Sequence, residues 1–356
     1  MSQPLLKYNY IYKYKIYYMK ENKISVNPSD DKDKEKSPFT SFINNIKNFF
    51  TNESISSSPD SRTTEQSSPS IKINSVPHSV PYSNKEWQEL FDSNSPDTIN
   101  QSRLLASLKK GIDSSLRGKI WMFLSKSFES YKKSKNSNNS YQSLLERTNP
   151  EAEELISRDI HRTFLNHKRK EMFPVDSDKL YRVLKGYSII DPEIGYCQGT
   201  NTIVGTILQC IGKEEFCFWT FHNMMKENNW RDFFIQKTPK LFRMVKVIKE
   251  NIKTRLKDLY DYFISIKFDD YLDIIFSHLF LTLFTYNCPL ELSFRIIDLF
   301  WVYEEKVIFD TTINILYLKK EKIKTLEYEE LLVYLKGDLV FDAVEEYGVD
   351  YIINMI

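Results

Sequence analysis

Two side chains in the segment 156–164 combine charge with helical spacing. Asp159 and Arg162 are three positions apart, so on a helix they are neighbours on one surface. A carboxylate at this spacing can hold a guanidinium in one direction and reduce the rotamer freedom that binding would otherwise cost. The guanidinium then offers a fixed positive charge in a planar fork. Taken alone, such a pair is more often a solvated surface feature that contributes little.

A second polar candidate, Gln198, falls in a connection between two helical patterns. Gly195 and Gly199 flank it and permit backbone angles and close approaches that a Cβ would resist, while Tyr196 offers a large flat anchor. A carboxamide both donates and accepts hydrogen bonds, which is what orienting an attacking water requires. An isolated glutamine here would by default cap the following helix.

The elements that position these residues are predicted to be almost entirely helical. From about Trp87 to the end, apolar residues recur at spacings of three and four, and Pro and Gly separate the segments. The predicted fold class is all-α, with many helices. The predicted ranges are 87–92, 101–109, 116–126, 141–147, 151–164, 179–188, 202–210, 213–228, 239–258, 261–267, 270–287, 289–304, 307–323 and 328–347.

The chain is expected to divide into a tail, 1–83, and a helical domain, 84–356, that ends in a C-terminal helix. All nine glycines lie at or after Gly111, whereas Ser, Asn, Pro and Lys crowd the beginning, so the tail is predicted to be mostly disordered. One apolar helical face stands out in it, at 39–50. This helix docks on a membrane or partner groove, or it folds back onto the domain.

Composition argues against several classes of function. The net charge is only +1, so nucleic acid is not an expected partner. His161 and His167 lack a clear third ligand, and no metal site is predicted. The four cysteines show no zinc or disulfide spacing and are predicted to be reduced thiols, and no apolar run suits a signal peptide or a membrane span. A cytoplasmic protein is expected.

Three blocks of sequence resemble the signature blocks of TBC-domain Rab GTPase-activating proteins. The first lies at 111–121, the second at 156–164 and the third at 189–201, in the order and spacing of that family. Together the resemblance covers roughly 111–320. The matching residues are Arg117 and Trp121 of an RxxxW block, Ile156, Asp159 and Arg162 of an IxxDxxR block, and Tyr196 and Gln198 of a YxQ block.

The resemblance implies an all-α domain with two catalytic fingers, of which Arg162 is the arginine finger and Gln198 the glutamine finger. The partner it implies is a Rab-family small GTPase in its GTP-bound form. GTP and Mg²⁺ would belong to that partner, so the chain has no cofactor of its own and is not an enzyme on its own substrate. The location it implies is cytoplasmic, with peripheral contact to endomembranes. Finger-positioning or partner-binding roles fall to Asp159, Tyr196, Gly199 and Asn201, and structural roles to Arg117, Trp121 and Ile156.

Five positions depart from the family pattern. These changes affect packing and loop shape, and so bear on the choice of Rab and on local stability more than on the two-finger chemistry. A noncatalytic adaptor that binds a GTPase or trafficking protein through the same surface is the alternative function, and a purely structural scaffold is a third. The departures are Asp113 and Leu165 where Pro is usual, Leu279 and Ile297 where Trp is usual, and Tyr303 in an expected acidic-Gly turn.

Overall fold

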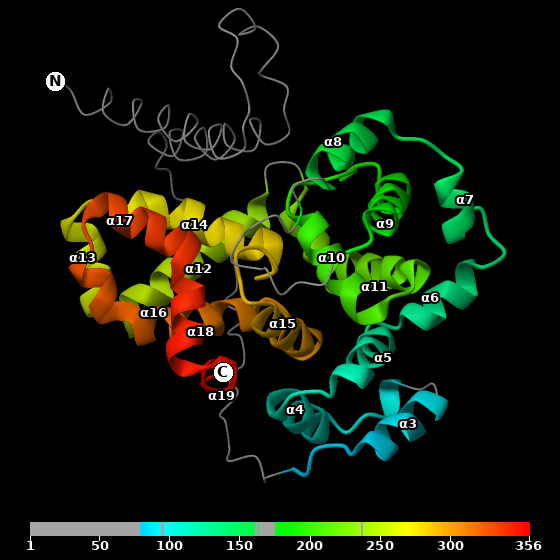
Figure 1. Ribbon diagram of the computed structural model, residues 1–356, viewed down its shortest axis with the longest axis horizontal. Helices are drawn as coiled ribbons and strands as arrows, with labels where there is room; N and C mark the ends of the chain where they lie inside the picture. The colour runs from blue at the N-terminus through cyan, green and yellow to red at the C-terminus, as the bar shows by residue number, and fades with distance from the viewer. Residues whose placement is uncertain (1–78, 94–95, 161–162, 164–174, 236–237) are drawn as a thin grey trace, which may run out of the picture. The chain divides into compact units, whose positions relative to one another are not determined.

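The computed structural model describes residues 79–93, 96–160, 163, 175–235 and 238–356. Every regular element in these ranges is a helix, which confirms the all-α fold class (Figure 1). The apolar helix predicted at 39–50, and nearly all of the tail that contains it, lie outside the described residues.

The helices follow one another through mostly short connections. The α-helices are α3 (Asn84–Ser93), α4 (Gln101–Lys110), α5 (Ser114–Leu124), α6 (Ser127–Ser134), α7 (Tyr141–Leu145), α8 (Pro150–Ile160), α9 (Ser177–Ile190), α10 (Thr200–Ile211), α11 (Glu214–Lys226), α12 (Pro239–Arg255), α13 (Lys257–Ser265), α14 (Asp269–Thr282), α15 (Leu290–Tyr303), α16 (Lys306–Thr325), α17 (Tyr328–Val333), α18 (Leu339–Tyr347) and α19 (Val349–Asn354). A short 3₁₀ helix, η4 (Trp230–Phe233), precedes α12.

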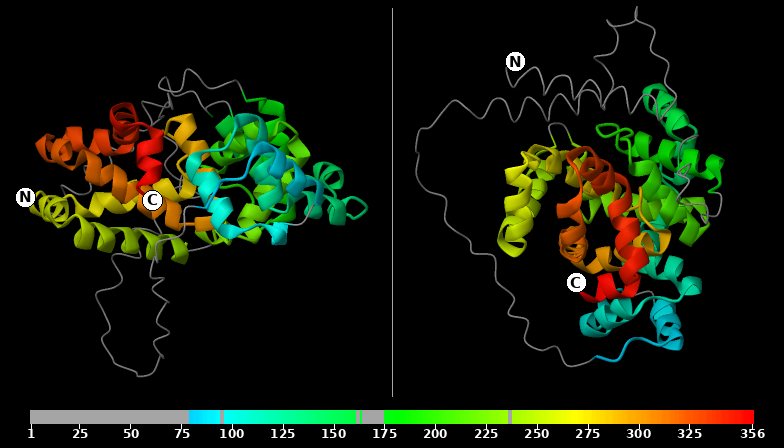
Figure 2. Two further views of the ribbon diagram at one scale, coloured as in Figure 1. Left: turned by 90° about the horizontal axis from the view of Figure 1, so that it is seen from below. Right: turned by 60° about the vertical axis from the view of Figure 1, so that its left-hand side comes forward.

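Helix α10 is the structural centre of the domain. It contacts α5, α8, α9, α11, α14 and α15, and each of its first nine residues is buried. Figure 1 shows α10 within the green group α8–α11, on the side that faces the yellow α14, and Figure 2 gives two further views. A helix that is buried all round is typical of the interior of a large helical domain. The connection that leads into α10 is therefore fixed to the core at one end.

One buried ion pair joins the beginning of the domain to its later half. Arg117 Nε lies 3.2 Å from both carboxylate oxygens of Asp298 on α15, and Trp121 Nε1 donates to Asp298 Oδ1 at 2.7 Å. Arg117 also donates to the carbonyl oxygen of Ile112 at 3.1 Å. The carboxylate is fully buried, so two donors from α5 supply the interactions that water would otherwise give.

Helices α5 and α10 meet at Gly118 without an intervening layer of side chains. A Cβ added at Gly118 would lie 2.3 Å from the carbonyl oxygen of Cys210. Only a residue without a side chain fits such a contact.

The structure corrects several predicted helix ranges. The range 328–347 is not one α-helix, because a π-helical turn, η5 (Tyr334–Asp338), separates α17 from α18. The range 270–287 is also wrong at its end, since α14 stops at Thr282 where the backbone turns left-handed at Leu283. Helices α6 and α19 were not predicted.

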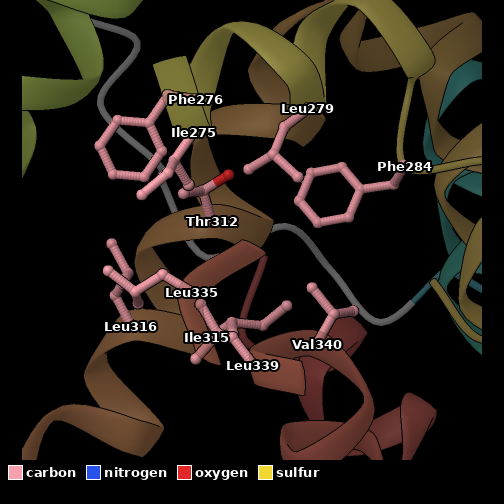
Figure 3. Close-up of a pocket in the computed structure, with 10 residues that line it drawn as sticks. All are labelled: Ile275, Phe276, Leu279, Phe284, Thr312, Ile315, Leu316, Leu335, Leu339 and Val340. Atoms are coloured by element: carbon pink, nitrogen blue, oxygen red, sulfur yellow. The ribbon is translucent and has the colours of Figure 1, made fainter. Parts of the chain in front are cut away.

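A small hollow lies between α14, α16, η5 and α18 (Figure 3). Its volume is about 20 Å³, close to the space that one water molecule needs. Among its lining residues only Thr312 carries a polar side-chain atom, and that hydroxyl already donates to the carbonyl oxygen of Ile308 at 2.7 Å. A water here would lack the partners it requires, so the hollow is a gap in packing and not a substrate site.

Candidate functional site

The hydroxyl of Tyr196 links the two segments whose side chains suggested chemistry. Tyr196, in the connection between α9 and α10, donates to Asp159 Oδ2 in the last turn of α8 at 2.7 Å. Both side chains are buried, although they are 37 positions apart in the chain. A buried hydrogen bond to a carboxylate is among the stronger ones in proteins, and it holds the end of α8 against the connection.

A second link lies one turn further along the same two segments. Asn201 Nδ2 donates to Thr163 Oγ1 at 2.8 Å, and Thr163 Oγ1 donates in turn to the carbonyl oxygen of Asp159 at 2.7 Å. Asn201 Oδ1 accepts from the backbone N–H of Gly199 at 3.1 Å. The amide of Asn201 therefore connects Thr163, which follows Arg162 in the chain, to Gly199, which follows Gln198.

Gln198 is exposed and stands directly before the residue that caps α10. That capping residue, Gly199, has a φ of 104°, and a Cβ there would lie 3.2 Å from the carbonyl oxygen of Leu281. Glycine is required here both for the left-handed backbone and for the close approach. The backbone that carries Gln198 is thus clamped on one side by α14.

Arg162 lies outside the described residues, as do His161 and His167. The pairing of Arg162 with Asp159 therefore stays a prediction. Within the described residues, the Asp159 carboxylate accepts a hydrogen bond from the hydroxyl of Tyr196. Of the remaining motif residues, Ile156, Trp121 and Arg117 are buried. Across the part of the chain that the structure describes, no group of His, Cys, Asp or Glu side chains is arranged to hold a metal ion.

Sequence reasoning missed Arg231, which clamps the start of the same connection. Its guanidinium donates to both carboxylate oxygens of Asp191, at 2.7 and 3.0 Å, and also to Glu193. Tyr187 donates its hydroxyl to Asp191 Oδ2 at 2.9 Å. Burial alone would raise the pKa of Asp191, but the hydrogen bonds from Arg231 and Tyr187 outweigh it and lower that pKa below its ordinary value. No local pattern marks Arg231, because it lies on η4, far along the chain.

The described part of the chain is thus an all-helical domain in which the α9–α10 connection, with the exposed Gln198, is hydrogen-bonded to the end of α8. Residues 114–324 match the family model described as "Rab-GTPase-TBC domain". The chain belongs to this family of TBC-domain Rab GTPase-activating proteins, and the resemblance drawn from the three blocks is confirmed.

Similar proteins include the GTPase-activating protein GYP5 of Eremothecium gossypii, which is 32% identical over 73% of the chain and 29% of the relative. The human ecotropic viral integration site 5 protein homolog is 30% identical over 73% of the chain and 31% of the relative. The chain thus spans about a third of the length of these curated relatives.

Solved structures that share the fold include two Rab-GAP domains. The crystal structure of the Chlamydomonas flagellar RabGAP TBC domain matches with a TM-score of 0.61 at 23% identity, covering 76% of this chain and 88% of that one. The Ypt/Rab-GAP domain of Gyp1p matches with a TM-score of 0.58 at 18% identity, covering 77% and 97%. Among the described helices, none has both the length and the apolar character needed to span a membrane.

Proposed function

We propose that this chain stimulates GTP hydrolysis by a Rab-type small GTPase, with Arg162 and Gln198 supplied in trans to the bound nucleotide. The observation that carries the proposal is the pair of hydrogen bonds Tyr196–Asp159 and Asn201–Thr163, which joins the segments on either side of the two fingers. The exposure of Gln198 adds support, because a finger must be accessible to a partner.

The chemistry follows from the charge that develops during hydrolysis. Negative charge builds on the β and γ phosphates of GTP, and a small GTPase alone positions neither a counter-charge nor the attacking water well. The guanidinium of Arg162 provides the charge and the carboxamide of Gln198 orients the water. An arginine supplied in trans accelerates hydrolysis by about 10³- to 10⁵-fold. GTP and Mg²⁺ remain with the partner, which is encountered at the cytosolic face of endomembranes.

The proposal is tested by measuring phosphate release from a panel of purified Rab GTPases loaded with GTP, with and without the full chain. We expect at least one Rab to be accelerated by about 10³-fold or more. The alternative function, a noncatalytic adaptor, predicts a different result. An adaptor binds a GTP-loaded Rab and leaves the rate of hydrolysis unchanged. Binding without acceleration across the panel would overturn the proposal in favour of the adaptor.

Removing the hydroxyl of Tyr196 tests whether the link to Asp159 matters for activity. In Tyr196→Phe the buried carboxylate loses one donor, which we expect to cost about 1 to 3 kcal/mol of stability. The α9–α10 connection, which carries Gln198, is then held less firmly. We therefore expect kcat of the stimulated reaction to fall by about 10- to 100-fold. Stopped-flow phosphate release measures kcat, and urea unfolding measures stability.

The matched control is Tyr181→Phe, which removes a hydroxyl that donates to Glu153 Oε2 at 2.6 Å, away from the connection. Its kcat should stay within about twofold of the wild type, a range set by the small effect expected of a surface substitution. Equal kcat values for the two variants would show that the hydroxyl of Tyr196 has no special role.

A further inference from the structure

The connection between α14 and α15 holds three residues other than glycine in the left-handed backbone conformation. Leu283, Phe284 and Asn287 have φ values of 48°, 54° and 47°. Asn visits this left-handed region comparatively often, but for the bulky Leu283 and Phe284 it is unfavourable and persists only where the surroundings impose it. All three lie within the five positions 283–287.

The surroundings do impose it, through both packing and hydrogen bonds. Leu283 and Phe284 are 0% and 1% exposed, so their side chains are anchored in the core. Ser293 donates its hydroxyl to the carbonyl oxygen of Phe284 at 2.7 Å, and the N–H of Thr285 donates to the carbonyl oxygen of Thr282 at 2.8 Å. The connection is therefore rigid, and its shape is set by buried groups.

This rigid connection lies against the amino-terminal end of α10. The hydroxyls of Thr285 and Thr202 are 2.8 Å apart, and both are buried. Gly199, next to Gln198, closely approaches the carbonyl oxygen of Leu281. The α14–α15 connection and the α9–α10 connection, which carries Gln198, thus lie at the same end of α10.

What the connection presents to solvent is Tyr286. Residues 282–285 before it are buried and Asn287 after it is partly buried, whereas Tyr286 is 41% exposed. The ring stands edge-on to His278 at 4.9 Å between centroids. Burial lowers the pKa of His278 to about 4, so the imidazole beneath the tyrosine is neutral near pH 7. The ring of Tyr286 is thus exposed on one side and packed against the neutral imidazole of His278 on the other.

We propose that Tyr286 is an anchoring contact for the GTP-loaded small GTPase, beside the glutamine finger. This proposal rests on the proposed function, since a partner that brings its nucleotide to Gln198 must cover the same end of α10. Tyrosine carries large apolar area at low entropic cost and is enriched among the residues that dominate binding energy. The strained backbone at Leu283 and Phe284 is held by their burial in the core, and it fixes the position of the exposed Tyr286 ring before any partner binds.

The first test separates binding from catalysis by steady-state kinetics on the Rab that the wild type accelerates most. Tyr286→Ala should raise KM for the GTP-loaded Rab by about 10- to 30-fold, the size expected of a dominant contact, with kcat within about twofold. Tyr286→Phe keeps the ring and should stay near the wild type. The control is Tyr317→Ala on α16, because Tyr317 is 50% exposed and equally aromatic. Equal KM values for Tyr286→Ala, Tyr317→Ala and wild type overturn the proposal.

The second test does not depend on activity or on the stability of the alanine variant. Photoreactive benzoylphenylalanine placed at position 286 should cross-link to the GTP-loaded Rab, whereas the same group at position 317 should not. A chain that accelerates a Rab but does not cross-link from position 286 keeps the proposed function and loses this inference. A chain that cross-links from position 286 without accelerating any Rab keeps the contact and loses the proposed activity.

Discussion

Replacing Arg162 by lysine is expected to remove nearly all stimulated hydrolysis while the domain remains folded. Lysine keeps the positive charge but offers a point charge in place of the planar fork that spans phosphate oxygens. The loss should reach about 10³-fold or more in kcat, as for other arginine fingers, and Arg162→Ala should lose at least as much. Single-turnover phosphate release with the most responsive Rab measures the effect.

The matched control is Arg158→Lys in α8. The Arg158 side chain is 65% exposed and pairs with Glu154 at 3.4 Å, so its replacement should leave the rate unchanged. Gln198→Ala in the same assay should also lose most of the stimulation, whereas Gln142→Ala, at another exposed glutamine, should not. If Arg162→Lys retained the wild-type rate, the two-finger mechanism would be wrong.

The second large effect is expected on stability, from Arg117→Met. Removing the guanidinium leaves the carboxylate of Asp298, which is 0% exposed, without its main counter-charge. Breaking a buried pair in this way costs about 3 to 5 kcal/mol, because the remaining charge is buried and uncompensated. Urea unfolding followed by circular dichroism measures the loss. The double variant Arg117→Met with Asp298→Asn should recover part of it, since Trp121 can still donate to the amide oxygen.

The pH dependence of stability gives an independent check on the same pair. Burial raises the pKa of Asp298 to about 6 despite the opposing effects of Arg117 and Trp121. A carboxyl whose folded pKa is raised contributes stability that is complete below its unfolded pKa of about 4 and is lost as the pH rises through 6. In Arg117→Met this loss should extend to higher pH, because the guanidinium that lowers the pKa is absent. A variant whose stability is flat between pH 4 and 7 would contradict this account.

The helical class and most helix positions could be predicted because they depend on local periodicity. Helix α6 escaped prediction because its apolar residues are few. It is stabilised by tertiary contacts in which Phe128 and Tyr131 pack on Phe216 of α11, at 6.2 and 5.3 Å between ring centroids. The end of α14 escaped for a related reason. Its stop is imposed by buried Leu283 and Phe284 in left-handed conformations, and neither residue type signals a helix end.

The candidate site shows the same division between local and distant information. Blocks of neighbouring residues, such as Tyr196 with Gln198, could be recognised because their spacing is visible in the chain. The partners that fix them are remote: Asp298 is 181 positions from Arg117, and Arg231 is 40 positions from Asp191. Spacing carries no information about such pairs, which exist only once the helices have packed. The roles of Arg162 and Gln198 in catalysis remain predictions for the kinetic tests above.

The close approach at Gly118 has a mechanical consequence for the surface connection. Two helices separated by a layer of side chains can rock against each other as those side chains change rotamer, but α5 and α10 touch backbone to backbone. Their thermal motion is therefore shared. Helix α5 carries Arg117 and Trp121, and α10 begins beside Gln198. Loosening of the Arg117–Asp298 pair should therefore increase the motion of Gln198 under conditions in which the domain as a whole is still folded.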